Sequence, residues 1–170
     1  MYSKDSTNHT ISFRYPKETL FNDISLMSNY MCKNMSTKDG NSLTDEYAIS
    51  DDEHDLVDVS VRATLPDIYE SLIKITSSVS SAFDDDVEIS TVHYVQFTIQ
   101  DNDSYNANVL STVDASLYNC LKFGTLREVY STITNAEFYN TCTTRFLAEL
   151  FKLKGRLFQL KKKSVVSSLT

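Results

Sequence analysis

The side chains best suited to metal binding or nucleophilic chemistry are three histidines and three cysteines: His9, His54, His93, Cys32, Cys120 and Cys142. A zinc site needs histidine and cysteine ligands at short spacings, and no histidine here lies near another or near a cysteine. His54 lies in the acidic run DDEHD, which is more simply the exposed first turn of a helix. The sequence therefore predicts no metal site.

Other patterns of catalysis or ligand binding are also incomplete. The stretch DNDSYN starts at Asp101 like a calcium loop, but Tyr105 takes the fifth position and no Glu stands at the twelfth. Gly40, Gly124 and Gly155 are isolated, whereas a phosphate-binding loop needs clustered glycines. The serines form no nucleophile elbow, and the acids lie in runs that suit helix caps and loops. We expect no catalytic residue and no cofactor, and so no enzyme.

The composition favours a helical protein with few loops. The chain has 170 residues, which fits one domain, and it contains only three Gly and two Pro. The three cysteines are odd in number and form no CxxC pair, which indicates a reducing compartment. The N-terminus has no apolar stretch of the kind found in signal peptides, and no segment approaches the length of a membrane span. We expect a protein made in the cytosol that has no membrane partner.

The predicted organisation is a helical domain with an arm. Residues 1–16 form an extended arm around ISFRY, residues 17–163 a single helical domain with a β insertion near 87–100, and residues 164–170 a short C-terminal tail. The predicted fold class is mainly α: a bundle of about four helices with a short β segment or hairpin and an extended N-terminal arm.

Apolar residues at helical spacing define the first two helices. The first begins at Lys17 and carries Leu20, Ile24, Met27 and Met31 on one face. The second follows a capping box of Ser50 and Glu53. Its apolar face comprises Val57, Val61, Leu65, Ile68, Leu72, Ile75 and Val79. Pro66 would either kink this helix or start a second one that Thr64 caps.

The segment VEISTVHYVQFTIQ, residues 87–100, is the clearest β pattern, because it alternates and is rich in β-branched and aromatic residues. A lone strand leaves its backbone groups unpaired. It would fold as a hairpin, pair with the arm, or pair with a neighbouring subunit. Its apolar side chains are candidates for a subunit interface: Ile89, Val95, Phe97 and Ile99.

Two helices close the chain, and the last has two apolar lines. The first of the pair carries the stripe Val109, Val113, Leu117, Cys120/Leu121, Gly124 and Val129. The last carries Phe138, Cys142, Phe146, Leu150, Leu153, Leu157 and Leu160. A further line beside it consists of Leu147, Phe151 and Phe158. Such a second line indicates either a partner or a helix enclosed in its own bundle, and we take these three residues as interface candidates.

Charge is distributed unevenly along the chain. Residues 1–144 have a net charge of −13 and residues 145–170 of +6, within a total of −7. Basic residues near a helix C-terminus are favoured by the helix dipole in any case. They also form a candidate docking surface for an acidic protein or for nucleic acid phosphates. This surface comprises Arg145, Lys152, Lys154, Arg156, Lys161, Lys162 and Lys163.

The order of these elements resembles small structural proteins of the head–tail gene region of Bacteroidetes phages and prophages. The resemblance spans about residues 17–163, and its most distinctive stretch is VYSTITNAEFY between the last two helices. Two features depart from the family pattern. Val129 and Tyr130 stand where a Trp-containing aromatic pair is expected, and lysines replace the usual terminal arginines.

The resemblance implies a head–tail connector, also called a neck or adaptor protein, which forms a ring between portal and tail. The implied partners are copies of the chain, the portal protein and other neck or tail proteins. The implied location is the virion, with assembly in the bacterial host cytoplasm, and the lysines would face genomic DNA in the channel or an acidic portal rim. Two alternatives remain: a tail-completion or other tail structural protein, and a small cytosolic helical regulator or nucleic-acid-associated protein.

Overall fold

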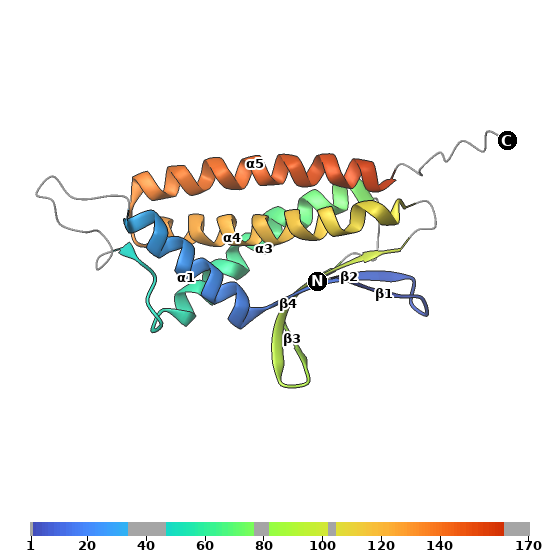
Figure 1. Ribbon diagram of the computed structural model, residues 1–170, viewed down its shortest axis with the longest axis horizontal. Coiled ribbons are helices and arrows are strands. Elements are labelled where there is room, and N and C mark those ends of the chain that lie inside the picture. Colours follow the sequence, from blue (N-terminus) through green and yellow to red (C-terminus); the bar gives the residue numbers. More distant parts are fainter. Residues whose placement is uncertain (1, 34–46, 77–81, 102–104, 162–170) are drawn as a thin grey trace, which may run out of the picture.

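Pairing between an N-terminal strand and a strand from the middle of the chain organises the fold (Figure 1). We describe it from a computed structural model, which defines residues 2–33, 47–76, 82–101 and 105–161, with the backbone alone at 74–76 and 82. The strands are β1 (Tyr2–Asp5), β2 (Thr10–Pro16), β3 (Ala82–Ile89) and β4 (Val92–Gln100). The helices are α1 (Lys17–Lys33), α3 (His54–Thr76), α4 (Leu110–Thr132) and α5 (Ala136–Lys161), with a short 3-10 helix at Ala107–Val109.

The four described strands form one antiparallel sheet in the order β1-β2-β4-β3. In the central pair, Ile11 lies opposite Ile99 and Phe13 opposite Phe97. Alternation along each strand places these side chains on one face of the sheet, where they are fully buried. The opposite face carries polar residues such as Arg14, whose Nε donates a hydrogen bond to Gln96 Oε1 over 2.6 Å.

The predicted fold class is therefore wrong. The described chain is mainly helical and contains four α-helices, but it joins them to a four-stranded antiparallel sheet rather than to a short β segment or hairpin and an extended N-terminal arm. The arm is absent because Ile11, Phe13 and Tyr15 bury one face of β2 against the helices. The segment predicted as one β element at 87–100 is the end of β3, a turn at Ser90-Thr91, and β4.

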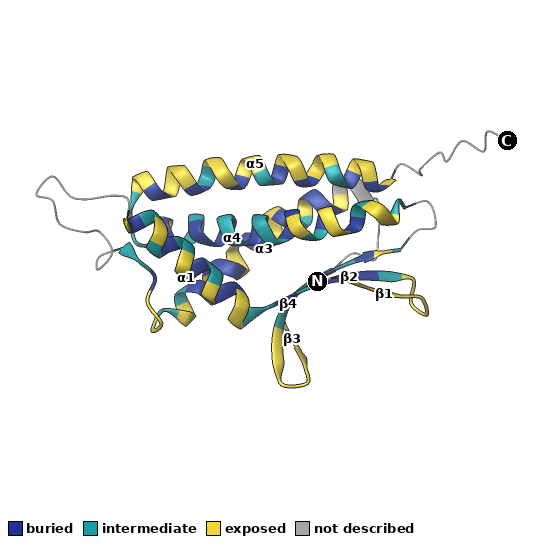
Figure 2. Ribbon diagram, in the orientation of Figure 1, coloured by how far each residue is buried: buried dark blue, intermediate teal, exposed yellow. Residues whose placement is uncertain are grey.

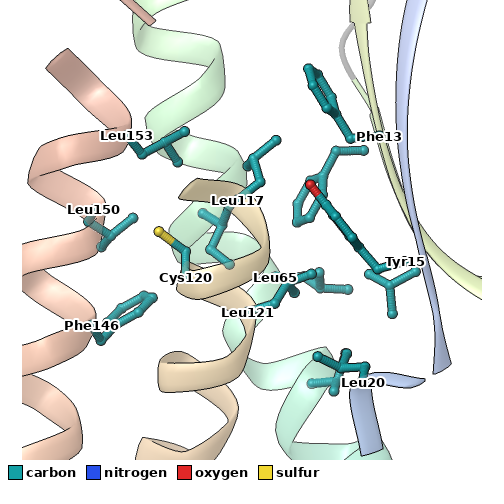
Figure 3. Close-up of a cluster of buried hydrophobic side chains, with 14 of the residues drawn as sticks. Phe13, Tyr15, Leu20, Leu65, Leu117, Cys120, Leu121, Phe146, Leu150 and Leu153 are labelled. Atoms are coloured by element: carbon teal, nitrogen blue, oxygen red, sulfur yellow. The ribbon is translucent and has the colours of Figure 1, made fainter. Parts of the chain in front are cut away.

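Helix α4 lies between α5 and the rest of the core and packs against both α5 and α3. Figure 3 shows Cys120 of α4 facing Phe146 and Leu150 of α5. It also shows Tyr15 of β2 approaching α4 from the other side, where its hydroxyl donates a hydrogen bond to Asp114 Oδ1 over 2.9 Å. Burial and the neighbouring Asp114 carboxylate raise the pKa of Tyr15, so this hydroxyl stays protonated and remains a donor.

The predicted helix faces of α1 and α3 agree with the structure where it describes them. In α1, Leu20 and Ile24 are buried and Met27 and Met31 are partly buried. The face of α3 is buried at Val57, Val61, Leu65, Ile68 and Leu72, whereas the Ile75 side chain and Val79 lie outside the described residues.

Helix α3 runs through Pro66 without interruption, so the alternative of a second helix capped by Thr64 is wrong. The predicted capping box is present in one direction, since Ser50 N–H donates to Glu53 Oε2 over 2.7 Å.

A close approach of three helices at Gly124 fixes the packing of α4. A Cβ atom at this position would lie 2.2 Å from Thr64 Cγ2 of α3 and 3.0 Å from Phe146 Cε2 of α5. Both neighbours are themselves buried, so neither can easily move away. A glycine is therefore required here for the helices to approach each other.

Candidate assembly surfaces

The core stripe of α5 is confirmed in full. All seven residues are buried, because spacings of three and four place them on one side of a helix that packs against α4 and α3. They are Phe138, Cys142, Phe146, Leu150, Leu153, Leu157 and Leu160.

The second apolar line of α5 faces solvent. Leu147 is 57% exposed, Phe151 80% and Phe158 60%, and we call these three residues the α5 ridge. Helical spacing places them on the side opposite the core stripe, so the alternative of a helix enclosed in its own bundle is wrong. The outward side of α5 appears as exposed in Figure 2. Three large apolar side chains aligned in this way form a continuous water-exposed strip.

Gly155 lies within this strip, between Phe151 and Phe158. A Cβ atom at Gly155 would meet nothing within 4 Å. The packing of the subunit itself therefore gives no steric reason for a glycine here, although glycine in a helix costs about 1 kcal/mol relative to alanine. The missing side chain leaves a notch in the strip at which another backbone can approach closely.

Exposed basic residues flank the ridge on both sides. Helical spacing places Lys154 and Lys161 on one flank and Lys152 on the other. Lys152 Nζ lies 2.7 Å from Glu149 Oε1, an ion pair of small energetic value. Arg145, which was predicted as part of this basic surface, instead places its guanidinium over the Phe123 ring of α4, 5.8 Å from the ring centroid. The three lysines give the edges of the apolar strip a positive charge.

Arg156 was predicted as part of this basic surface, but it is turned toward its own subunit. Its Nη1 donates to the Thr112 carbonyl oxygen over 2.6 Å and also contacts Ser116 Oγ. Arg156 therefore ties α5 to α4. Lys162 and Lys163 lie outside the described residues.

The β residues predicted for an interface separate into two groups. Val95, Phe97 and Ile99 are fully buried in the core of the subunit, so their assignment to an interface is wrong: β2 and the helices already cover them. Ile89 differs, because it is 37% exposed near the end of the β3–β4 hairpin, next to Val92. This hairpin projects from the body of the protein (Figure 1).

The turn of this hairpin is conformationally strained. Ile89 and Val92 form the last pair of the two strands, and the two residues between them have positive φ angles, 51° at Ser90 and 67° at Thr91. Two-residue hairpin turns of this kind favour Asn-Gly, because side chains with a branched Cβ fit the left-handed region poorly. The neighbouring strands must therefore hold Thr91 in this conformation.

A groove of about 500 Å³ lies between the start of α1, the start of α3 and the β3–β4 hairpin. We call it the hairpin groove. Its floor is apolar and includes Leu20, Phe21, Val57 and Val61. The imidazole of His54 stacks on the Phe21 ring, with 3.5 Å between the ring centroids.

Charged side chains form the rim of the hairpin groove and hold the hairpin beside the helices. Lys17 Nζ lies 3.0 Å from Asp58 Oδ2 and 3.8 Å from Asp86 Oδ1. His93 Nδ1 lies 2.7 Å from the same Asp86 oxygen. The hydrogen bond with His93, with a smaller effect from the Lys17 charge, lowers the pKa of the Asp86 carboxyl.

The amino-acid sequence contains no direct sign of this groove. His54 and His93 appear isolated along the chain, yet both line it, because strand pairing returns residues 82–100 to the start of α3. In the part of the chain that the structure describes, no group of three or more His, Cys, Asp or Glu could hold a metal ion.

The same described part contains no helix that combines the length and apolarity needed to cross a bilayer. Comparisons of the chain with protein-family models, curated proteins and solved structures find no match.

Proposed function

We propose that this protein is a structural subunit of a phage neck, a head–tail connector whose copies form a ring that joins the portal to the tail. The observation that carries the proposal is the α5 ridge, with its exposed Leu147, Phe151 and Phe158. The resemblance of the chain to head–tail region proteins supplies the biological setting.

An exposed strip of this kind favours assembly for an energetic reason. Burying one large apolar side chain contributes about 1.5–3 kcal/mol, so a partner that covers the ridge gains several kcal/mol from three residues. Aromatic side chains in the centre of a dry contact are also the usual source of most of the binding energy. The exposed Phe151 and Phe158 are therefore the anchors that we expect at a subunit contact.

The proposed partners are other copies of the chain, the portal protein, and other neck or tail proteins of the virion. The exposed cations of α5 suit an acidic protein surface, and with the terminal lysines they also suit non-specific contact with genomic DNA in the channel. Assembly would take place in the host cytoplasm.

The test compares two substitutions on opposite sides of one helix. Phe151→Asp changes a side chain that is 80% exposed, so we expect a folded subunit that no longer assembles. Leu153→Asp buries an unpaired charge in the core and should unfold the subunit. Leu26→Asp, at an apolar residue of α1 that is 71% exposed, is the matched control and should assemble like the wild type.

Mass photometry of the purified chain, alone and with a portal protein from the same phage or prophage, measures assembly, and circular dichroism measures folding. Ring-sized particles for the wild type and Leu26→Asp, but not for Phe151→Asp, are the expected result. A wild-type chain that remains monomeric and does not bind the portal would contradict the proposal. Immunoelectron microscopy of virions that finds the protein only at the distal tail would favour a tail-completion protein instead.

A further inference from the structure

The α5 ridge and the hairpin groove lie on opposite sides of the subunit. In Figure 1, α5 runs along one side of the molecule, whereas the starts of α1 and α3 and the β3–β4 hairpin lie on the other. One subunit therefore presents both a convex apolar surface and a concave one, directed away from each other. Two such surfaces on one rigid body suit a head-to-tail contact between copies.

The two surfaces match in size. An apolar cavity of about 150 Å³ can hold one benzene ring, so a groove of about 500 Å³ has room for the phenyl rings of Phe151 and Phe158 together. These residues are seven positions apart, which corresponds to about 10 Å along a helix. The buried apolar floor of the groove offers the dry surroundings that such rings favour.

The two surfaces also have opposite charge. The groove rim contains Glu18, Asp58 and Asp86 and one lysine, Lys17, which pairs with Asp58 and Asp86. The adjoining segments 51–58 and 84–88 contain five and four acids and no base, so the groove side remains acidic. The α5 ridge is flanked by three exposed lysines, whereas the one acid among residues 145–161 is Glu149, which is already paired with Lys152. Contact between ridge and groove therefore brings opposite charges together at its edge.

The same charges disfavour pairing of one α5 with a second α5. Such a symmetric contact would place the ridge of each copy against the other, with Lys152, Lys154 and Lys161 of both copies along the seam. Like charges in this position repel. The acidic groove does not have this disadvantage.

We propose that the α5 ridge of one copy inserts into the hairpin groove of the next copy, with Phe151 and Phe158 on the apolar floor and the flanking bases against the acidic rim. This inference rests on the proposed function and adds the contact by which the ring forms. Each contact uses the ridge of one copy and the groove of the next, so each copy still has its other surface available for a further neighbour. A closed ring of copies leaves neither surface free.

The test uses one variant for each surface. Val92→Arg places a bulky cation at an exposed position that lines the groove near the hairpin turn. Val59→Arg is its matched control, since Val59 is exposed on α3 but does not line the groove. Phe151→Asp removes the ridge. Circular dichroism and thermal unfolding verify that each variant is folded, and native mass spectrometry measures the assembly.

We expect Val59→Arg to assemble like the wild type, and Val92→Arg and Phe151→Asp each to remain as single chains. Mixing the last two should give a species of two chains and nothing larger. The Val92→Arg copy supplies an intact ridge and the Phe151→Asp copy an intact groove, and the remaining two surfaces are blocked. A two-chain product from two variants that are each monomeric is a result that general loss of stability would not produce.

Three results would overturn the inference. Assembly of Val92→Arg like the wild type would show that the ridge docks elsewhere, as in an α5–α5 pair, and would leave the proposed function in place. A wild-type chain that is monomeric alone but binds the portal would also overturn the ridge–groove contact and leave the proposed function in place. A wild-type chain that neither assembles nor binds the portal would overturn both.

Discussion

The hydroxyl of Tyr130 donates a hydrogen bond to Ser28 Oγ over 3.0 Å inside the core, and it joins α4 to a residue of α1 that lies 102 positions earlier. The same Ser28 Oγ accepts the backbone N–H of Ile49 over 2.9 Å. Both side chains are fully buried. One serine therefore holds together two helices and the segment that leads into α3.

Substitutions of Tyr130 and Ser28 should lower the free energy of unfolding by different amounts. Tyr130→Phe removes one donor, and we expect it to lower the free energy of unfolding by about 1 kcal/mol. Ser28→Ala should cost more, about 1–3 kcal/mol, because it leaves both Tyr130 and the Ile49 N–H buried without this partner. Ser131→Ala, at an exposed residue of α4, is the control and should change stability by less than about 0.5 kcal/mol. Urea unfolding measures all three, and equal costs for Tyr130→Phe and Ser28→Ala would contradict the shared role of Ser28.

The two helical glycines of α4 and α5 should respond in opposite ways to alanine. Gly124→Ala forces a Cβ into Thr64 and Phe146 and should destabilise the subunit by about 1–3 kcal/mol. Gly155→Ala meets open space and should stabilise it by up to about 1 kcal/mol. Thermal unfolding of the two variants gives the comparison. If Gly155 is the notch for a neighbour, Gly155→Ala should also weaken assembly although the subunit is more stable.

The β3–β4 turn offers a second route to greater stability. The turn requires positive φ angles at both positions, and Asn and Gly adopt such angles at less cost than Ser and Thr. Replacing Ser90 and Thr91 with Asn-Gly should therefore stabilise the subunit by about 1 kcal/mol or more. Hydrogen exchange of the amides in residues 82–100 should slow accordingly. Faster exchange in the variant would show that the native turn residues are not strained.

The buried thiols and phenols predict a loss of stability at alkaline pH. Burial raises the pKa of Cys142 from 9.0 to about 12, and it also raises the pKa of Tyr130. Between pH 9.0 and about 12 the unfolded chain loses the Cys142 proton while the folded chain retains it. The unfolded state then binds fewer protons, so stability falls as pH rises through this window and is fully present below it.

Urea unfolding at neutral pH and at several pH values above 9.0 tests this dependence. The matched variant Cys142→Ala lacks one of the titrating groups, so its stability should fall less steeply over the same range. A free energy of unfolding of the wild type that rises from pH 9 upward would contradict this prediction.

The sequence predicts the helices of this protein well because their signal is long and regular. The stripe from Phe138 to Leu160 repeats over six turns of α5, and each member is buried. The exposed position of Leu147, Phe151 and Phe158 follows from the same period. Their spacing alone left open whether the bundle itself encloses them.

The sheet was harder to predict because tertiary pairing overrides local preference in it. Strand β3 contains Asp84, Asp85 and Asp86, and acids are unfavourable in strands, so local preference does not indicate a strand at these residues. At the edge of the sheet these carboxylates reach solvent and find cations. Asp85 pairs with Arg62, and Asp86 lies beside His93 and Lys17.

The hairpin groove and the contact of Arg156 with α4 could not be predicted from the sequence for a similar reason. The groove combines residues of α1, α3 and the β3–β4 hairpin, which are adjacent only after β4 has paired with β2. Arg156 reads as one more base of the C-terminal run, and its contact with the Thr112 carbonyl depends on how α4 and α5 pack.

The distant pairing of β2 with β4 has a consequence for synthesis of the chain on the ribosome. Residues 10–16 emerge early, but their partner, residues 94–100, follows about 80 residues later. At about 5–20 residues per second, Ile11, Phe13 and Tyr15 stay uncovered by β4 for several seconds or more. During this interval the nascent chain exposes an unpaired apolar strand, which is a binding target for chaperones. Recombinant expression at reduced temperature together with a holdase should therefore raise the soluble yield.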